Sequence, residues 1–303
     1  MPHNRLSNTR LYLLDLGLLV IALSWGASYS LMQLIIQAGI TVPLFLMLRF
    51  ALSVPFILIG AQIRLRKITQ GELVNGLIFG CLLYAILTLE TLGVKYTTAA
   101  NAGFLIALSV VIVPFFERVF GKRKQSKLIY CTCILSLVGG GILSFANTGN
   151  FGINKGDVLI LLAALIRGFQ IFMFGKQTEC ESYSLINITL IELVTVALLG
   201  FIFVLTIEPT SLRFIPAISL NAWGYILFLS VMATAFAFLM QLYAAKTTSP
   251  TRVGLILSLE PAFAALFAII LMGESIGILK GIGGAIIVLS ALLGRIAEGR
   301  HYE

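Results

Sequence analysis

Long apolar runs recur along almost the whole chain, and no other feature constrains its fold as strongly. A helix needs roughly 20 apolar residues to cross a membrane, and runs of about that length follow one another from Leu11 almost to the C-terminus with short connections. We therefore predict an all-α integral membrane protein with ten transmembrane helices. The predicted spans cover residues 11–36, 43–61, 73–94, 98–117, 128–146, 157–176, 184–206, 221–243, 252–272 and 277–294.

The composition agrees with this prediction and excludes a soluble globular protein. Hydrophobic residues make up 59% of the chain and charged residues 11%, whereas soluble domains carry about a quarter charged residues. The first span is too long for the apolar part of a signal peptide, so we expect a retained helix. The net charge of +8 is scattered over short connections. We therefore expect the lipid bilayer, and no nucleic acid, as the partner of these basic residues.

The residues that usually build catalytic and metal centres show no such pattern. Neither a CxxC pair nor a metal-like spacing occurs among the four cysteines and two histidines, which are Cys81, Cys131, Cys133, Cys180, His3 and His301. A glycine-rich P-loop is also absent from the sequence. We expect no enzyme activity, no metal, no cofactor, no disulfide framework and no histidine proton relay.

Lysine and arginine are unevenly shared between the connections. Most of them fall on the side of the membrane that holds the N-terminus, and the other side keeps only Lys95, Lys155, Arg213 and Lys280. Cytoplasmic connections carry the excess of positive charge. Both termini are therefore predicted to be cytoplasmic.

The two halves of the chain repeat one another weakly. Several positions of the first span recur at constant spacing in the sixth span: Asp15, Leu19, Ala22, Leu23 and Gly26 match Asp157, Leu161, Ala164, Leu165 and Gly168. The predicted units are residues 1–147 and 148–303, each with five helices. Because five is odd, the second unit enters the membrane from the opposite side. Such inverted repeats are typical of transporters that bind their substrate between the halves near the bilayer midplane.

Two segments at matching places in the halves carry a resemblance to a known family. The first runs from Gly93 to Leu105 (GVKYTTAANAGFL), and the second begins at Lys246 (KTTSPTRVG) and continues with Leu259-Glu260-Pro261 and Gly273-Glu274. The chain resembles the drug/metabolite transporter superfamily, EamA type, over essentially its whole length. The resemblance implies ten helices, the cell inner membrane, and export or exchange of metabolites, amino acids or drugs. It does not identify the substrate.

Charged residues within the predicted spans are the first candidates for a substrate site. A charge near the bilayer centre costs at least roughly 2.5–3.5 kcal/mol, so it needs a partner or a wet cavity. From depth alone, we expect Arg167, Glu192 and Glu260 to form one group, and Arg49 and Glu90 a second. Each group either binds substrate or forms a static bridge between helices. If protons are coupled to transport, one of the three glutamates carries them.

Aromatic and amide side chains complete the candidate site. Trp25 and Tyr29 lie one turn apart on the first span and either stack on a solute or pack against lipid. The amides of Asn101, Gln170 and Gln241 bond either substrate or a neighbouring helix. For the repeat-matched Asp15 and Asp157, a role as cap or interface residue is favoured over transport.

Glycines in the fifth and tenth spans indicate close packing, either within the bundle or between protomers. Gly277-x-x-x-Gly281 is the clearest example, and a homodimer is possible. We predict that the cavity is built by the first four helices of each half. The predicted function is secondary transport of small metabolites by alternating access. The alternatives are a flippase for a lipid-linked group or a structural membrane protein.

Overall fold

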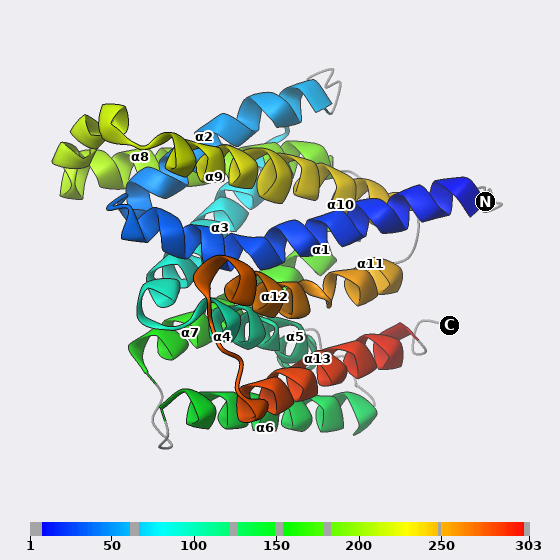
Figure 1. Cartoon of the computed structure of the whole chain (residues 1–303). Helices are drawn as coiled ribbons and strands as arrows, with labels where there is room; N and C mark the ends of the chain where they lie inside the picture. Colours follow the sequence, from blue (N-terminus) through cyan, green and yellow to red (C-terminus); the bar gives the residue numbers. More distant parts are fainter. Residues whose placement is uncertain are drawn as a thin grey trace.

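The chain folds into a helical bundle in the computed structural model, which describes residues 8–60, 67–120, 127–148, 154–178, 183–247 and 250–299. Within these ranges every regular element is a helix (Figure 1). Helices suit such an apolar chain, because lipid offers no partners to backbone N–H and C=O groups. The elements are α1 Asn8–Gln37, α2 Val42–Gly60, α3 Gln70–Tyr96, α4 Ala99–Ile106, α5 Leu108–Val119, α6 Lys127–Thr148, α7 Lys155–Thr178, α8 Leu185–Ile207, η1 Pro209–Ala217, α9 Leu220–Ser230, η2 Val231–Phe236, α10 Ala237–Thr247, α11 Pro250–Leu257, α12 Glu260–Met272 and α13 Ile278–Gly299.

Each predicted span coincides with one helix or with an interrupted helix. Among the described residues, seven helical segments are long and apolar enough to cross a membrane. Three shorter apolar helices lie at Tyr130–Ile142, Glu260–Met272 and Ile278–Gly294. The all-helical, multi-pass architecture is therefore present, with several of the crossings made by broken helices.

The breaks fall in three of the predicted spans. α11 ends at Leu257 and α12 begins at Glu260, as expected from Pro261, which lacks an amide proton and clashes with the carbonyl four residues earlier. The span 98–117 is split at Ala107 into α4 and α5. The span 221–243 contains a π-helical stretch, η2, between α9 and α10. None of the other spans is interrupted within the described residues.

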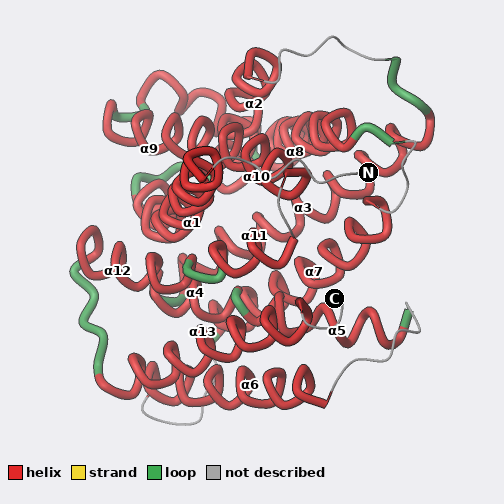
Figure 2. The backbone as a smooth tube through the Cα atoms, turned by 90° about the vertical axis from the view of Figure 1, so that its right-hand side faces the viewer, coloured by secondary structure: helices red, strands yellow, loops and turns green. Residues whose placement is uncertain are grey.

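The pair α6 and α13 lies at one edge of the bundle, and α2 lies at the opposite edge, in both views (Figures 1 and 2). α6 and α13 approach each other closely at Gly139, where an added side chain would collide with the carbonyl of Gly283. Gly277 and Gly281, by contrast, have no described neighbour within 4 Å of an added side chain. The predicted glycine motif therefore packs nothing within the described chain.

The two halves are arranged as related units. α1 and α7, which open the halves, run in opposite directions (Figure 1). α1 packs against α12, and its counterpart α7 packs against α5. The matching helices α2 and α8 pack on one another, as do α6 and α13. This is the contact pattern that a two-fold relation between the halves produces.

Candidate functional site

Four polar side chains from four different helices meet inside the bundle. Nη2 of Arg167 lies 3.5 Å from Oε1 of Glu90, and Nη1 lies 3.8 Å from Oε1 of Glu260. The hydroxyl of Tyr29 donates a hydrogen bond of 2.6 Å to the same oxygen of Glu260. We call Tyr29, Glu90, Arg167 and Glu260 the central group. It joins α1 and α3 of the first half to α7 and α12 of the second.

The central group is loosely bonded, with Tyr29 and Glu90 buried and Arg167 and Glu260 partly exposed. Glu90 is 2% exposed, and its Oε1 atom has no hydrogen-bond partner. Both ion pairs are longer than the roughly 2.7–2.9 Å of a charge-assisted hydrogen bond. A guanidinium carries five N–H donors in a planar fork. Arg167 therefore holds two carboxylates at a distance that leaves its donors available to another anionic group.

The break between α11 and α12 positions one member of this group. α12 begins at Glu260 because Pro261 occupies its first turn, where a missing amide proton costs nothing. The carboxylate of Glu260 therefore lies at a helix N-terminus, which favours negative charge. Tyr29 reaches it from α1, which packs along α12.

Arg49 lies beside the central group and not in a separate pair with Glu90. Its Nε atom donates a hydrogen bond of 3.0 Å to Oγ1 of Thr234, and its guanidinium lies over the rings of Phe45 and Phe50, 5.9 Å and 5.4 Å from their centroids. It is close enough to Glu90 for their charges to interact. Arg49 and Glu90 therefore interact as predicted, but the ion-pair partner of Glu90 is Arg167.

The π-helical stretch η2 supplies two contacts that the sequence analysis missed. Thr234, which accepts from Arg49, donates its own hydroxyl proton to the carbonyl of Leu229 at 2.9 Å. The carbonyl of Ala233 accepts a hydrogen bond of 2.9 Å from Nε1 of Trp25. Trp25 therefore directs its polar edge into the protein. π-helical turns occur mostly as bulges in α-helices, often at functional sites. The local sequence gives no signal that predicts this one.

Glu192 belongs to a second polar contact, separate from Arg167. Its Oε1 atom accepts a hydrogen bond of 2.9 Å from Nε2 of Gln170, which also donates to the carbonyl of Phe79 at 3.2 Å. The predicted meeting of Arg167, Glu192 and Glu260 is therefore wrong for Glu192. Depth placed these residues at similar levels, but the helical faces of α7 and α8 decide which of them meet.

The remaining amide candidates are placed differently. Asn101 is fully buried on α4, and neither its side-chain oxygen nor its nitrogen has a hydrogen-bond partner. Gln241 lies half-buried on α10. Asn101 is thus a second buried polar group whose bonding capacity is unused.

Three other buried or half-buried acids anchor helix ends. Glu72 accepts hydrogen bonds from the backbone N–H groups of Thr69 and Ser184, at 3.0 Å and 2.7 Å. Glu274 accepts from the N–H groups of Ala99 and Ala100 at the start of α4. Asp157 accepts from the hydroxyl of Thr97 at 2.6 Å, in keeping with its predicted structural role. Sequence reasoning missed Glu72, although Thr-x-x-Glu is the signature of a capping box.

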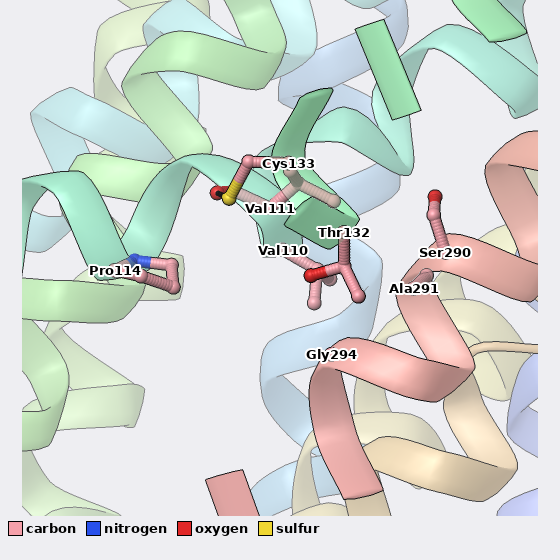
Figure 3. A pocket seen from close by; sticks show the side chains of 8 residues that line it. All are labelled: Val110, Val111, Pro114, Thr132, Cys133, Ser290, Ala291 and Gly294. Carbon is pink, nitrogen blue, oxygen red and sulfur yellow. Dashed lines mark hydrogen bonds between the residues drawn. The ribbon is translucent and has the colours of Figure 1, made fainter. Parts of the chain in front are cut away.

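A small pocket lies away from all of these groups, between α5, α6 and α13 (Figure 3). Its polar features are few: the thiol of Cys133 donates to the carbonyl of Val111 at 3.1 Å, and Ser290 and Thr132 contribute hydroxyl groups. None of the predicted site residues lines it. The central group and this pocket are therefore distinct places in the fold.

Comparison with known proteins identifies the family. The model of the EamA-like transporter family matches residues 13–145 and again residues 154–294. A protein of Archaeoglobus fulgidus, named an uncharacterized transporter, is 27% identical over 289 residues, or 94% of this chain and 86% of that protein. The uncharacterized transporter YyaM of Bacillus subtilis is 21% identical over 76% of this chain and 74% of its own. A solved crystal structure with 18% identity covers 94% of this chain and 99% of its own, with a TM-score of 0.64.

These findings agree with the predicted resemblance and with a chain built from two repeats. The double match covers both halves, and the apolar helices described above make the protein a multi-pass membrane protein. The family is one of transporters and not of enzymes. The chain belongs to the EamA-like transporter family.

Proposed function

We propose that this protein is a secondary carrier that moves small polar solutes across the cell inner membrane by alternating access. The central group is the observation that carries the proposal. It is charged, incompletely bonded and at most partly exposed, and it lies between helices of both halves. Ionisable residues inside a membrane mark solute pathways by default, and repeat transporters bind their substrates at such an interface.

The chemistry of the central group favours a solute that carries both a carboxylate and an ammonium group. Arg167 offers N–H donors to an anion, and the carboxylates of Glu90 and Glu260 accept from a cation. Such a solute would replace the long ion pairs of the group with shorter hydrogen bonds. Amino acids and related organic solutes have this pattern, and we propose their export or exchange.

The membrane arrangement that goes with this proposal has ten crossings in two inverted five-helix units. The opposite directions of α1 and α7 support it, and so does the excess of lysine and arginine in alternate connections. Both termini would then lie in the cytoplasm. Exchange of the conformations of the two halves would expose the central group first to one side and then to the other.

Two measurements on the purified protein test the function. The first is a thermal-shift screen in detergent against amino acids, organic acids, amines, nucleosides and lipid precursors. The second is counterflow of a mixture of radiolabelled L-amino acids in proteoliposomes, with protein-free liposomes as the control. Saturable counterflow supports a carrier. Stabilisation by lipid precursors alone, with no counterflow, contradicts the proposal and favours a flippase.

A further inference from the structure

Glu192 is the membrane-embedded carboxylate that the central group leaves without an arginine. It lies on α8 and is 3% exposed. Its Oε1 atom accepts one hydrogen bond, from Gln170, and among the described residues it forms no ion pair. Glu90 and Glu260, by contrast, share the positive charge of Arg167. The three glutamates therefore differ in how their charge is balanced.

Among the described side chains, the helices around Glu192 bring no cation to it. α8 packs against α2, α3, η1 and α10, and Gln170 reaches it from α7. Most ionisable groups on these elements are engaged elsewhere or exposed: Arg49 bonds Thr234, Glu72 bonds Ser184 and Asn187, Tyr84 stacks on Phe203, Glu90 and Arg167 pair together, and Cys81, Arg213 and Tyr243 are exposed. Gln170 is thus the polar group that acts on the carboxylate of Glu192.

Protonation would remove the charge from a buried carboxylate in this setting. Removing an ion from water costs several kcal/mol even after relaxation, and one neutral hydrogen bond offsets only part of that. A proton on the oxygen that does not accept from Gln170 removes the charge. When helix movements open the site to water, the ionised form becomes favourable and the O–H bond releases its proton. Such a group binds a proton on one side of a membrane and releases it on the other.

The amide of Gln170 links this carboxylate to the central group. Its two N–H donors tie α7 to Glu192 on α8 and to the carbonyl of Phe79 on α3. Gln170 follows Arg167 by three residues, so both side chains project from one face of α7, about one turn apart. α3 and α8 are closely packed at this level. A side chain added to Gly80 would collide with Thr195 and with the carbonyl of Glu192. A change of charge at Glu192 therefore acts on the helix that carries Arg167.

From these contacts we infer that Glu192 binds the proton whose movement drives transport, at a site separate from the solute-binding central group, with Gln170 as the positioning residue between them. This inference rests on the proposed carrier function and deepens it. It selects one of the three glutamates in the membrane.

Infrared spectroscopy tests proton binding without any solute. pH-difference spectra are recorded from the full-length protein in liposomes, where a protonated carboxylic acid gives its own C=O stretching band. Glu192→Gln is expected to lose a band that the unaltered protein shows. Glu72→Gln is the matched control and should keep it, because Glu72 is held ionised by N–H donors. An unchanged spectrum in Glu192→Gln overturns the inference.

A second variant covers the case in which Glu192→Gln does not fold. Gln170→Leu removes the hydrogen bond to Glu192 while keeping the carboxyl group, and a free C=O group vibrates at higher frequency than a hydrogen-bonded one. The band should therefore shift to higher frequency. A band at its original position would contradict the link through Gln170.

Transport measurements separate this inference from the proposed function. Uptake of radiolabelled L-amino acids into proteoliposomes is compared with and without an imposed pH gradient. The unaltered protein should be faster with the gradient, Glu192→Gln should have one rate under both conditions, and Glu192→Asp should regain the difference. Acceleration by the gradient in Glu192→Gln overturns the inference and leaves the carrier intact. Absence of counterflow by the unaltered protein overturns the carrier function itself.

Discussion

Glu72 and Glu90 lie on the same helix, α3, and are almost equally buried, at 3% and 2% exposure, yet their surroundings are opposite. Glu72 accepts hydrogen bonds from two backbone N–H groups and from Nδ2 of Asn187, at distances of 2.7–3.0 Å. Glu90 has one long ion pair with Arg167, and its Oε1 atom accepts no hydrogen bond. The first carboxylate is saturated, and the second is not.

The difference shows that burial alone does not distinguish a structural acid from a functional one. The donors around Glu72 come from the start of α3 and the start of α8, so its carboxylate fastens two helix ends together. Buried polar groups are normally satisfied, and an exception needs an explanation. For Glu90, the explanation we propose is a solute that supplies the missing bonds. The variants below test that contrast, in order of their expected effect on the free energy of unfolding.

Arg167→Ala should have the largest effect. It leaves the carboxylates of Glu90 and Glu260 buried without a counter-charge, and breaking a buried pair in this way costs about 3–5 kcal/mol. Unfolding in detergent should show this loss, and amino-acid counterflow should disappear. The double variant Arg167→Ala/Glu90→Gln is the control and should recover part of the stability, because one stranded charge is removed. Normal stability together with normal counterflow in Arg167→Ala would contradict the proposal that the central group binds the solute.

Glu72→Gln should reduce stability without affecting the solute site. The amide keeps one acceptor oxygen where the carboxylate has two, so charge-assisted hydrogen bonds worth about 2–3 kcal/mol are lost. Thermal unfolding should occur at lower temperature, while the concentration of amino acid that gives half-maximal counterflow stays the same. A change in that concentration would make Glu72 part of the transport pathway and end the contrast with Glu90.

Tyr29→Phe should have an intermediate effect. It preserves the ring and its packing but removes the donor to Oε1 of Glu260. Side-chain hydrogen bonds between membrane helices contribute up to about 1–2 kcal/mol. We expect a loss of stability within that range and a changed affinity in counterflow, because Glu260 then depends on Arg167 alone. Ser53 donates only within its own helix, so Ser53→Ala is a suitable control that should leave affinity unchanged.

Glu90→Gln should have the smallest effect on stability and a large effect on transport. The charge that is removed pairs with Arg167 only at 3.5 Å, and Arg167 keeps its pair with Glu260 and is partly exposed, so the unfolding free energy should change less than in the other three variants. Counterflow of amino acids should nevertheless fall steeply. Because the same substitution is made on the same helix in Glu72→Gln, the two variants form a matched pair. Equal losses of stability in the two would contradict the difference in saturation.

Much of the fold was predictable from the apolar runs, because a membrane allows few alternatives to helices. Every predicted span coincides with helical structure, and the break before Glu260 follows from Pro261. The interruption of the span 221–243 by η2 was not predictable, since Val231–Phe236 reads as an ordinary apolar helix. A π turn is stabilised by contacts with Trp25 and Arg49 from other helices, and these contacts have no local signal.

The residues of the central group were all among the predicted candidates, but the contacts between them were only partly predicted. Depth along each helix places Arg167, Glu260 and Glu192 at comparable levels, but depth says nothing of the direction in which a side chain points. That direction depends on how α7, α8 and α12 are rotated and which neighbours they meet. The ion pair between Glu90 and Arg167 was therefore missed, and Glu192 was grouped with Arg167 in error. The capping box at Thr69 and Glu72 was available in the sequence, because its signal is local.

The π turn between α9 and α10 has a consequence for how the chain tolerates insertion and deletion. A π-helical turn holds about one residue more than an α-helical turn. Removal of one residue from Val231–Phe236 would leave the length and apolarity of this span almost unchanged. An α-helical turn would then take the place of the π turn, and Gln241 would keep close to its present face of α10. In an uninterrupted α-helix, the same deletion would rotate everything that follows by about 100°, the angle between successive residues.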